Sequence, residues 1–441
     1  MLHTLLFVGV YISGFLLTFA ANGVYSFMLY EAVYFFSPLD RWWSYNIPSL
    51  RYSFMTVILM FAAVVIKTLK QQSQNKLLAA PQFKWVYSLL ALYLIASLYA
   101  VLPQDHQVAA INYLKLIVII SVAYKLIDEA KHLDYAIWGY IFVSWYISFL
   151  TWQTCRNDGD RVEGIGTVDS PDENGIAAAI VPRLVLCLCY FWLNKSKLSK
   201  ILFAIAGVFV ANALVLINSR GAFLAGATSI AFFMYYFYFS SFRRRYQRLI
   251  AIWLTIAGLA GFLYLADELF FERIKTMQNT EIVQEEQTGA TRVIFWLSAW
   301  EMAKDYPFGN GVRGFDYYAP DYIPSGYDVG FSRNRSVHST WFEVLTEIGY
   351  LGLILLMVMV YSCFRATREC KTKLKEKGDH ESYYKIIAIE AALVAYLVAM
   401  SFMNRFRAEI LYWLILYTAC AYNIYVVKPS SSSMMEKKRY K

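Results

Sequence analysis

Long apolar runs alternate with short polar segments along most of this chain. Twelve runs of about 20 residues can be delimited, a length that crosses a hydrocarbon layer as a helix. Their continuous apolar character differs from the alternating pattern of a membrane β-barrel, the other backbone arrangement that lipid tolerates. The pattern predicts transmembrane helices at residues 3–21, 50–69, 84–103, 107–127, 133–153, 174–194, 200–218, 221–240, 248–267, 341–364, 385–404 and 408–427.

Composition agrees with this pattern. Of the 441 residues, 58% are hydrophobic and 17% charged, with a mean hydropathy of +0.41, whereas a soluble chain carries roughly a quarter charged residues. The predicted fold class is an all-α membrane protein of about 12 transmembrane helices with one large outer loop that contains amphipathic helices. The expected organisation is helices 1 to 9 in 1–267, the loop in 268–340, helices 10 to 12 in 341–427, and a disordered cytoplasmic tail in 428–441.

The basic residues orient the predicted helices. If the N-terminus is cytoplasmic, 25 of the 41 Lys and Arg residues fall in the cytoplasmic segments and 14 in the longer outer ones, as the positive-inside rule requires. The +9 charge is thereby explained by loops rather than by nucleic-acid binding. The first span resembles a signal peptide but has no basic n-region, so we expect a retained helix. Only Cys155 lies in an outer loop, so no disulfide is expected there.

The outer positive charges are mostly arginine. Twelve Arg and 2 Lys are outside, against 7 Arg and 18 Lys inside. Lys as a topology signal accounts for the inner side alone, and a planar guanidinium suits phosphate and carboxylate. Either the outer face recognises anions, or the arginines have ordinary structural roles.

Within the large loop, Val293, Trp296, Leu297, Trp300 and Ala303 recur at helical spacing before Pro307. This periodicity predicts an amphipathic helix that lies at the outer membrane interface.

Three outward-facing helix starts carry polar residues: Ser170-Pro-Asp-Glu173, Asn218-Ser-Arg-Gly221 and His338-Ser-Thr340. The first and third, the latter with Glu343, have the spacing of a capping box. Helix N-termini attract anions, so convergence of these ends with Arg161, Arg220 and His338 would create an anion site. Nearby cations would lower the pKa of His338 and keep its imidazole neutral, as a general base requires.

Each of these residues also has a plainer interpretation. His338 can be an interfacial histidine bonded to a carbonyl, Arg220 can reach lipid phosphates, and Arg292 can be the polar side of the interfacial helix. Arg333 and Arg335 can likewise be lipid-facing charges. Asp169, Asp172 and Glu173 would suit a divalent metal, but capping accounts for them without one. The ionisable residues inside the spans, Lys115, Arg183 and Glu390, form no regular relay, which disfavours a transporter.

The ordered motifs resemble those of the O-antigen ligase and O-antigen polymerase superfamily of bacterial envelope glycan enzymes. The resemblance is carried by Asn218-Ser-Arg-Gly-Ala222, by Arg292 with Trp296, by Pro307-Phe-Gly-Asn-Gly-Val312, and by the stretch from His338 to Gly352. Asp172-Glu-Asn174 matches loosely, since the family commonly has Asp-Pro-Asn, and Ser339 stands where Asn usually follows the histidine.

The resemblance implies a metal-independent, inverting glycosyltransferase of the bacterial inner membrane whose active site, beside the large loop, faces the periplasm. Its donor would be a glycan on undecaprenyl diphosphate, and its acceptor a sugar hydroxyl of lipid A–core; no cofactor and no nucleic acid are expected. His338 would be the base, with Arg220 and Arg161 also catalytic. Substrate would be bound by Arg292, Arg313, Arg333 and Asn174. An O-antigen polymerase or a protein O-glycosylation ligase of the same superfamily is the alternative, and a lipid-glycan transporter a more distant one.

Overall fold

The computed structural model describes residues 1–70, 75–156, 161–162, 164–170, 172–266, 268, 271, 289–326 and 332–429. These residues are overwhelmingly helical, and no strand occurs among them. The predicted tail beyond residue 429 lies outside the described residues.

Ten helical segments within the described ranges are long and apolar enough to cross a membrane. They are α1 (Leu2–Ala20), α3 (Tyr52–Leu69), α5 (Pro103–Leu126), the pair α7 (Glu173–Ile180) and α8 (Pro182–Leu193), α9 (Lys197–Ile217), α10 (Arg220–Phe239), α11 (Gln247–Leu265), α15 (Thr340–Glu376), α16 (His380–Met400) and α17 (Glu409–Tyr422) with the π-helical turn η4 (Asn423–Val427). The all-α membrane fold is confirmed. The other two expected spans are helices as well, α4 (Pro81–Ala96) and α6 (Ala130–Thr154).

A buried helix of the bundle was missed. α2 (Val24–Phe36) fills a segment expected to be an outer loop, and nearly all its side chains are buried. At 13 residues it is too short for a pattern search tuned to a whole bilayer. It is followed by the 3₁₀ turns η1 (Pro38–Asp40) and η2 (Ser44–Asn46); a third, η3 (Leu77–Ala79), precedes α4.

This extra helix reverses the direction of α1. His3, at the start of α1, packs its ring 5.8 Å from that of Tyr146, in the second half of α6. Asn22, just after α1, bonds instead to His132 near the start of α6. The first residues therefore lie on the same side as the loop 155–172, and the expectation that they lie on opposite sides was wrong. α2 leads the chain back, so that α3 still begins on the expected outer side, where Tyr52 packs on Phe7, and ends on the side of Asp128.

The segments predicted to be cytoplasmic come together at the opposite end of the bundle. Asp128 pairs with Lys67 at 2.6 Å and with Lys428 at 3.4 Å. Asn75 bonds to Asn423 there as well. These contacts join three segments that are far apart in sequence, and they confirm that the segments share one side.

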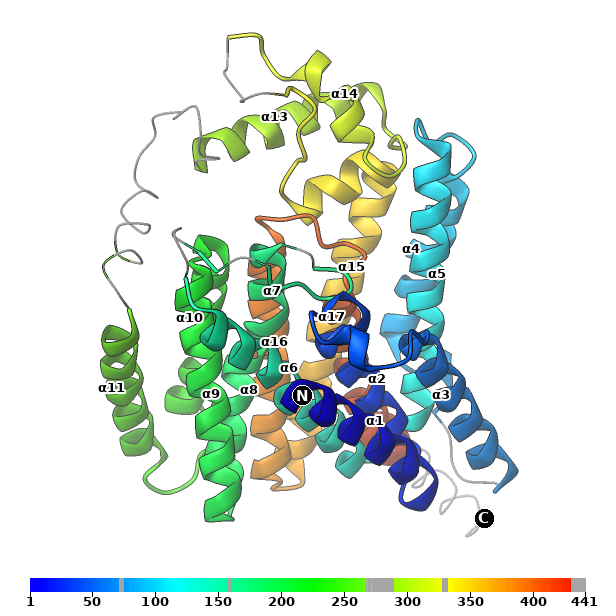
Figure 1. Ribbon diagram of the computed structural model, residues 1–441. Coiled ribbons are helices and arrows are strands. Elements are labelled where there is room, and N and C mark those ends of the chain that lie inside the picture. Colours follow the sequence, from blue (N-terminus) through cyan, green and yellow to red (C-terminus); the bar gives the residue numbers. More distant parts are fainter. Residues whose placement is uncertain are drawn as a thin grey trace, which may run out of the picture.

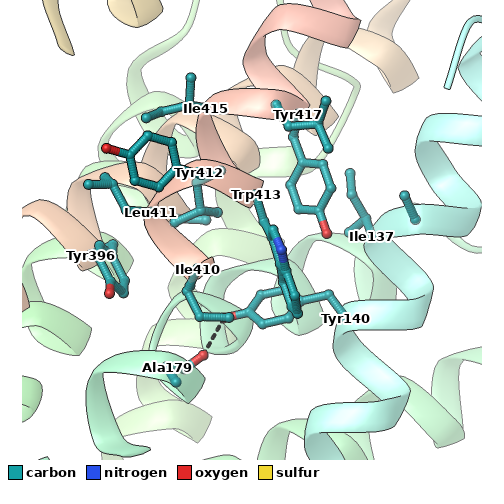
Figure 2. Close-up of a cluster of buried hydrophobic side chains, with 14 of the residues drawn as sticks. Ile137, Tyr140, Ala179, Tyr396, Ile410, Leu411, Tyr412, Trp413, Ile415 and Tyr417 are labelled. Atoms are coloured by element: carbon teal, nitrogen blue, oxygen red, sulfur yellow. Dashed lines mark hydrogen bonds between the residues drawn. The ribbon is translucent and has the colours of Figure 1, made fainter. Parts of the chain in front are cut away.

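α17 forms the centre of the bundle. Every residue from Ile410 to Ala421 is buried. Figure 2 shows Trp413 beside Tyr140 of α6, whose hydroxyl donates to the carbonyl of Ala179 in α7. Because other helices bury α17 on all sides, it provides a fixed base for the loop that precedes it.

The large loop forms a separate layer above the bundle (Figure 1). α13 (Gly289–Asp305) lies across the helical bundle and packs on α14 (Gly314–Tyr322). Between them is a small core that includes Phe295, Ala299, Met302 and Phe315. The amphipathic helix predicted here is present, but its protein-facing side is formed by Phe295, Ala299 and Met302. Of the predicted stripe, Val293, Leu297 and Trp300 are 47%, 62% and 45% exposed, whereas Ala303 is buried and Trp296 packs against this core.

Backbone hydrogen bonds join this layer to α15. The helix kinks at Gly349, which has a φ of 71°, and at the kink Tyr350 N donates to Pro307 O at 3.1 Å. Gly309 also has a positive φ, and a Cβ there would lie 2.5 Å from the backbone of Glu347. Glycine is required where backbones approach this closely. The Pro307–Val312 motif therefore attaches the large loop to the helix that begins at the candidate site.

Candidate functional site

The loop between α16 and α17, residues 401–408, contacts the starts of three helices (Figure 1). Asn404 bonds to the backbone at the start of α15. The Arg405 guanidinium pairs with Asp172, the N-cap of α7, at 2.9 Å. In the first turn of α10, a Cβ added to Gly221 would lie 3.3 Å from the Phe402 side chain. The three outward helix starts, whose convergence was the condition for an anion site, thus all meet the 401–408 loop.

His338 occupies a left-handed turn immediately before α15, with a φ of 50°. A non-glycine residue is uncommon there. Asn404 holds this turn from both sides: its Nδ2 donates to Ser336 Oγ at 2.7 Å, and its Oδ1 accepts from Ser339 N at 3.1 Å. The conformation of His338 is thus set by a residue that follows it by more than sixty positions in the chain.

The surroundings of His338 favour the neutral imidazole. Burial lowers its pKa from 6.5 to about 4, with further lowering by the positive charges of Arg292 and Arg335 and an opposing contribution from Asp172. A proton on the ring would have to be desolvated beside two guanidinium groups. At neutral pH the side chain can therefore accept a proton; the expected cations contribute to the lowered pKa, but burial is its largest cause.

At the start of α7, the expected cap was wrong. The helix begins at Glu173 and is capped by Asp172, which accepts from Gly175 N at 2.8 Å. Ser170, the expected cap, instead donates to Asp169 at 2.9 Å; the intervening proline lies outside the described residues. Asp172 serves better because its carboxylate also pairs with the buried Arg405 guanidinium.

The capping box expected at the start of α15 was also wrong. Thr340 Oγ1 donates to Met403 O and accepts from Arg405 N, both at 2.8 Å. The Glu343 carboxylate accepts from Phe406 N at 3.1 Å. Both side chains thus bind the 401–408 loop instead of each other, because that loop lies against the helix end and supplies its own donors and acceptors.

A second arginine of the loop binds deeper along α15. Arg407 pairs with Glu343 at 3.2 Å and with Glu347, and it donates to Tyr93 OH of α4 at 2.7 Å. The two carboxylates raise the pKa of Arg407 well above its usual value, against the effect of burial. The other oxygen of Glu347 accepts from Arg313 N at 3.3 Å, so this ion-pair cluster joins the 401–408 loop to the large loop.

Besides His338, six catalytic and substrate-binding residues were predicted, and three of them lie near the 401–408 loop or the helix starts that it contacts. Arg292 is on α13, close enough to His338 to lower its pKa. Arg220 is the half-buried first residue of α10, beside Gly221 and its contact with Phe402. Arg161 is half-buried in the loop between α6 and α7. Further along this loop, the carbonyl of Asp169 accepts a hydrogen bond from the Arg405 guanidinium.

The other three predicted residues have different surroundings. Arg313 is on the large loop and pairs with Asp105 at 3.4 Å and Asp316 at 3.3 Å. Arg333 donates to the carbonyl of Ile323. Asn174 is half-buried in the first turn of α7, and its amide makes no hydrogen bond with the described part of the chain. Of these three, Asn174 alone lies beside a helix end that reaches the site.

The metal interpretation receives no support from the contacts of the acidic residues. Asp169 accepts from Tyr34 OH, from Ser170 and from Glu409 N, and Asp172 is engaged by Gly175 and Arg405. Within the described ranges, no three His, Cys, Asp or Glu side chains gather as a metal site would require.

The outer arginines are largely structural. Arg41 Nε donates to Phe36 O at 3.1 Å, and Arg156 Nη2 to Val215 O at 2.6 Å. Among the described residues, at least six outer arginines bind groups of the protein itself: Arg41, Arg156, Arg313, Arg333, Arg405 and Arg407. Their number is therefore no measure of anion recognition, whereas the position of Arg292 relative to His338 is informative.

Asn404 and Arg405 were not among the predicted site residues, and Arg335 was interpreted as a lipid-facing charge. The available signal was the polar run Asn404-Arg-Phe-Arg-Ala-Glu409 between two apolar segments. It was overlooked because residue 404 was assigned to a span and only three residues remained for the loop.

Comparison with known protein families addresses the resemblance directly. Residues 205–357 match a family model described as O-antigen ligase. This segment, about a third of the chain, is similar to O-antigen ligases. It contains the start of α10, Arg292, the Pro307–Val312 motif and His338, which carried the resemblance; the loose Asp172–Asn174 match lies outside it. Among curated proteins no match was found.

The matched family in general implies glycan ligase or polymerase activity, with polyprenyl-linked glycan substrates and lipid-linked acceptors. Within the matched segment, His338 has Arg292 and Arg335 close enough to act on its pKa, and these are ionisable groups suited to such chemistry.

Proposed function

We propose that this protein is an O-antigen ligase that transfers a glycan from undecaprenyl diphosphate to a sugar hydroxyl of lipid A–core at the periplasmic face of the inner membrane. The observation that carries the proposal is a neutral, half-buried His338 that faces two arginines where the starts of α7, α10 and α15 meet. The family match supports the class of reaction.

In the proposed reaction, His338 removes the proton from the acceptor hydroxyl as its oxygen attacks the anomeric carbon. The new glycosidic bond forms as the bond between that carbon and the diphosphate oxygen breaks. Attack opposite to the leaving group inverts the anomeric centre. Undecaprenyl diphosphate departs with the electron pair, and the proton stays on His338 until it passes to solvent.

Arginine side chains assist the departure of the diphosphate. Arg292 is placed beside His338, and we assign Arg220 and Arg161 to the same task because each lies on or near a helix start that reaches the site. Guanidinium groups and helix N-termini stabilise negative charge that develops on the leaving group. Asn174, half-buried in the first turn of α7, is assigned to substrate through its amide, which can both donate and accept hydrogen bonds.

The same electrostatics link donor binding to catalysis. Burial, together with Arg292 and Arg335, lowers the pKa of His338 to about 4, which makes the imidazole a weak base. A bound diphosphate would offset these positive charges and raise that pKa towards neutral, where a general base works best. His338 then becomes an effective base when the donor is present.

The exposed side of α13 gives a reason for the location of the site. Val293, Leu297 and Trp300 form an exposed apolar stripe that suits the boundary between lipid and water. A helix anchored there holds Arg292 at the depth of lipid headgroups. Both proposed substrates carry their reactive groups at that depth.

The test is transfer in vitro with purified lipid-linked donor and lipid A–core. His338→Ala and Arg220→Ala should abolish transfer, whereas His380→Ala, on the other side of the bundle, should retain it. Transfer by His338→Ala at the wild-type rate would disprove the assignment of the base. Activity in the presence of a chelator should be unchanged; its loss would return Asp169, Asp172 and Glu173 to consideration as metal ligands.

A deletion strain distinguishes the ligase from its nearest alternatives. Loss of a ligase leaves long glycans on the carrier lipid, and loss of a polymerase leaves single units on the core. Loss of a protein O-glycosylation ligase removes glycan from proteins and leaves lipopolysaccharide intact. A lipid-glycan transporter would leave the purified protein without transfer activity.

A further inference from the structure

A cavity of about 450 Å³ lies between α10, α15 and α16, at the end of the bundle away from His338. Three cationic side chains line it, Arg368, Lys371 and Lys375, against the single carboxylate of Glu390. This end of α15 belongs to a segment that the distribution of basic residues predicts to be cytoplasmic.

The Glu390 carboxylate already has partners within the protein. Glu390 is 4% exposed, accepts from Thr367 at 3.1 Å, and pairs with Lys371 at 2.5 Å. The Lys371 ammonium group also lies 4.7 Å from the centre of the Tyr236 ring. Arg368 and Lys375 are left with no carboxylate partner among the described residues, and Lys375 donates only to Ser241 Oγ, at 3.1 Å. The cavity therefore has an excess of positive charge.

Neighbouring cations on the same helix behave differently. Arg365 pairs with Glu369 at 3.2 Å, and Lys373 with Glu376 at 3.1 Å. Carboxylates spaced three or four residues away neutralise cations on the outer surface of α15. Arg368 and Lys375, which line the cavity, have no such partner. An external anion bound in the cavity would neutralise them.

The surface next to the cavity indicates which anion. Ile354, Met357 and Tyr361 are 51%, 48% and 66% exposed, and their spacing places them on the face of α15 that also carries Arg368. An apolar strip thus leads along the membrane-spanning part of the helix to a cationic cavity. A free anion would use only the cavity, whereas a lipid would occupy both.

We propose that this cavity binds the phosphate group of an anionic phospholipid from the cytoplasmic leaflet, with an acyl chain along Ile354, Met357 and Tyr361. Arg368 and Lys375 contact the phosphate, and Lys371 remains paired with Glu390. Basic cavities between transmembrane helices on this side suit such headgroups. The bound lipid bridges α10, α15 and α16 and stabilises the end of the helix whose other end carries His338.

The experiment titrates dioleoylphosphatidylglycerol into the delipidated full-length protein in neutral detergent and follows the midpoint of thermal unfolding, which a ligand of the folded state raises. Dioleoylglycerol supplies the tails without phosphate, and inorganic phosphate supplies the anion without tails. The test variant is Arg368→Gln with Lys375→Gln. Its matched control, Arg365→Gln with Lys373→Gln, removes the same charge from the same helix.

We expect phosphatidylglycerol to raise the midpoint of the wild type and of the control, with half-saturating concentrations within about twofold of each other. The test variant should need at least about tenfold more lipid, since each cation near a headgroup contributes severalfold to binding. Equal titrations of the two double variants would overturn the site. The same stabilisation by inorganic phosphate alone would overturn the assignment of a lipid. The same stabilisation by dioleoylglycerol would overturn the assignment of the phosphate group. None of these outcomes depends on glycosyl transfer.

Discussion

Replacing Asn404 with alanine should slow catalysis without preventing donor binding. The side chain makes two hydrogen bonds, of 2.7 and 3.1 Å, to the residues that flank the turn of His338. Each contributes about 1 kcal/mol net. The left-handed φ of 50° at His338 costs about 1–2 kcal/mol, so the turn relaxes once its support is removed. A loss of about 2 kcal/mol from the productive conformation corresponds to about a 30-fold lower kcat.

The assay is steady-state transfer with purified donor and acceptor. Asn404→Ala should lower kcat about 30-fold and leave KM for the donor nearly unchanged, because the arginines assigned to the diphosphate remain in place. Asn112→Ala, whose amide bonds only to Lys115 on the exposed side of α5, is the matched control. Wild-type kcat in Asn404→Ala would refute the positioning role.

A conservative variant separates positioning from general stability. Asn404→Asp keeps an acceptor for Ser339 N, and the Ser336 hydroxyl can donate to its other oxygen. It should therefore recover most of the rate. The added negative charge should raise the pKa of His338 from about 4 and move the acidic limb of the rate profile to higher pH. Recovery of rate without movement of that limb would show that Asn404 is remote from the ring.

Three further predictions concern stability. Gly175→Ala would place a Cβ 1.6 Å from the Arg405 guanidinium, so it should lower the unfolding midpoint by displacing the ion pair with Asp172. The pKa of His338 in the folded protein is depressed to about 4, so the unfolded chain binds the proton first as the pH falls. The free energy of unfolding should therefore decrease between about pH 6.5 and 4. His338→Gln should weaken this pH dependence. Arg407→Gln leaves the Glu347 carboxylate buried without its partner and should destabilise the protein by about 3–5 kcal/mol.

Matched controls keep these predictions specific. Gly207→Ala should be mild, because its Cβ would lie 3.5 Å from Cys187 in ordinary contact. Arg313→Gln removes a side chain that is 62% exposed, for which a surface pair contributes about 0–1 kcal/mol. If Gly175→Ala unfolds no earlier than Gly207→Ala, or Arg407→Gln no earlier than Arg313→Gln, the 401–408 loop does not hold the helix ends together.

The sequence by itself determined the fold class, the ten long spans and the segments that gather at the basic end of the bundle. The physical reason is that these properties depend on local quantities: apolar length against bilayer thickness, and charge on either side of it. His338 could also be singled out, because it is next to a helix start and the pattern of its neighbours already implied a cationic setting.

Tertiary structure decided the rest. α2 is stable as a 13-residue helix because other helices bury it, so no length rule could find it, and its presence reversed α1. The caps expected at α7 and α15 were replaced by partners from residues 401–408, which lie far from either helix in sequence. The turn of His338 depends on Asn404 for the same reason. Local patterns specify which groups are available for hydrogen bonding, and packing between distant segments decides which of them meet.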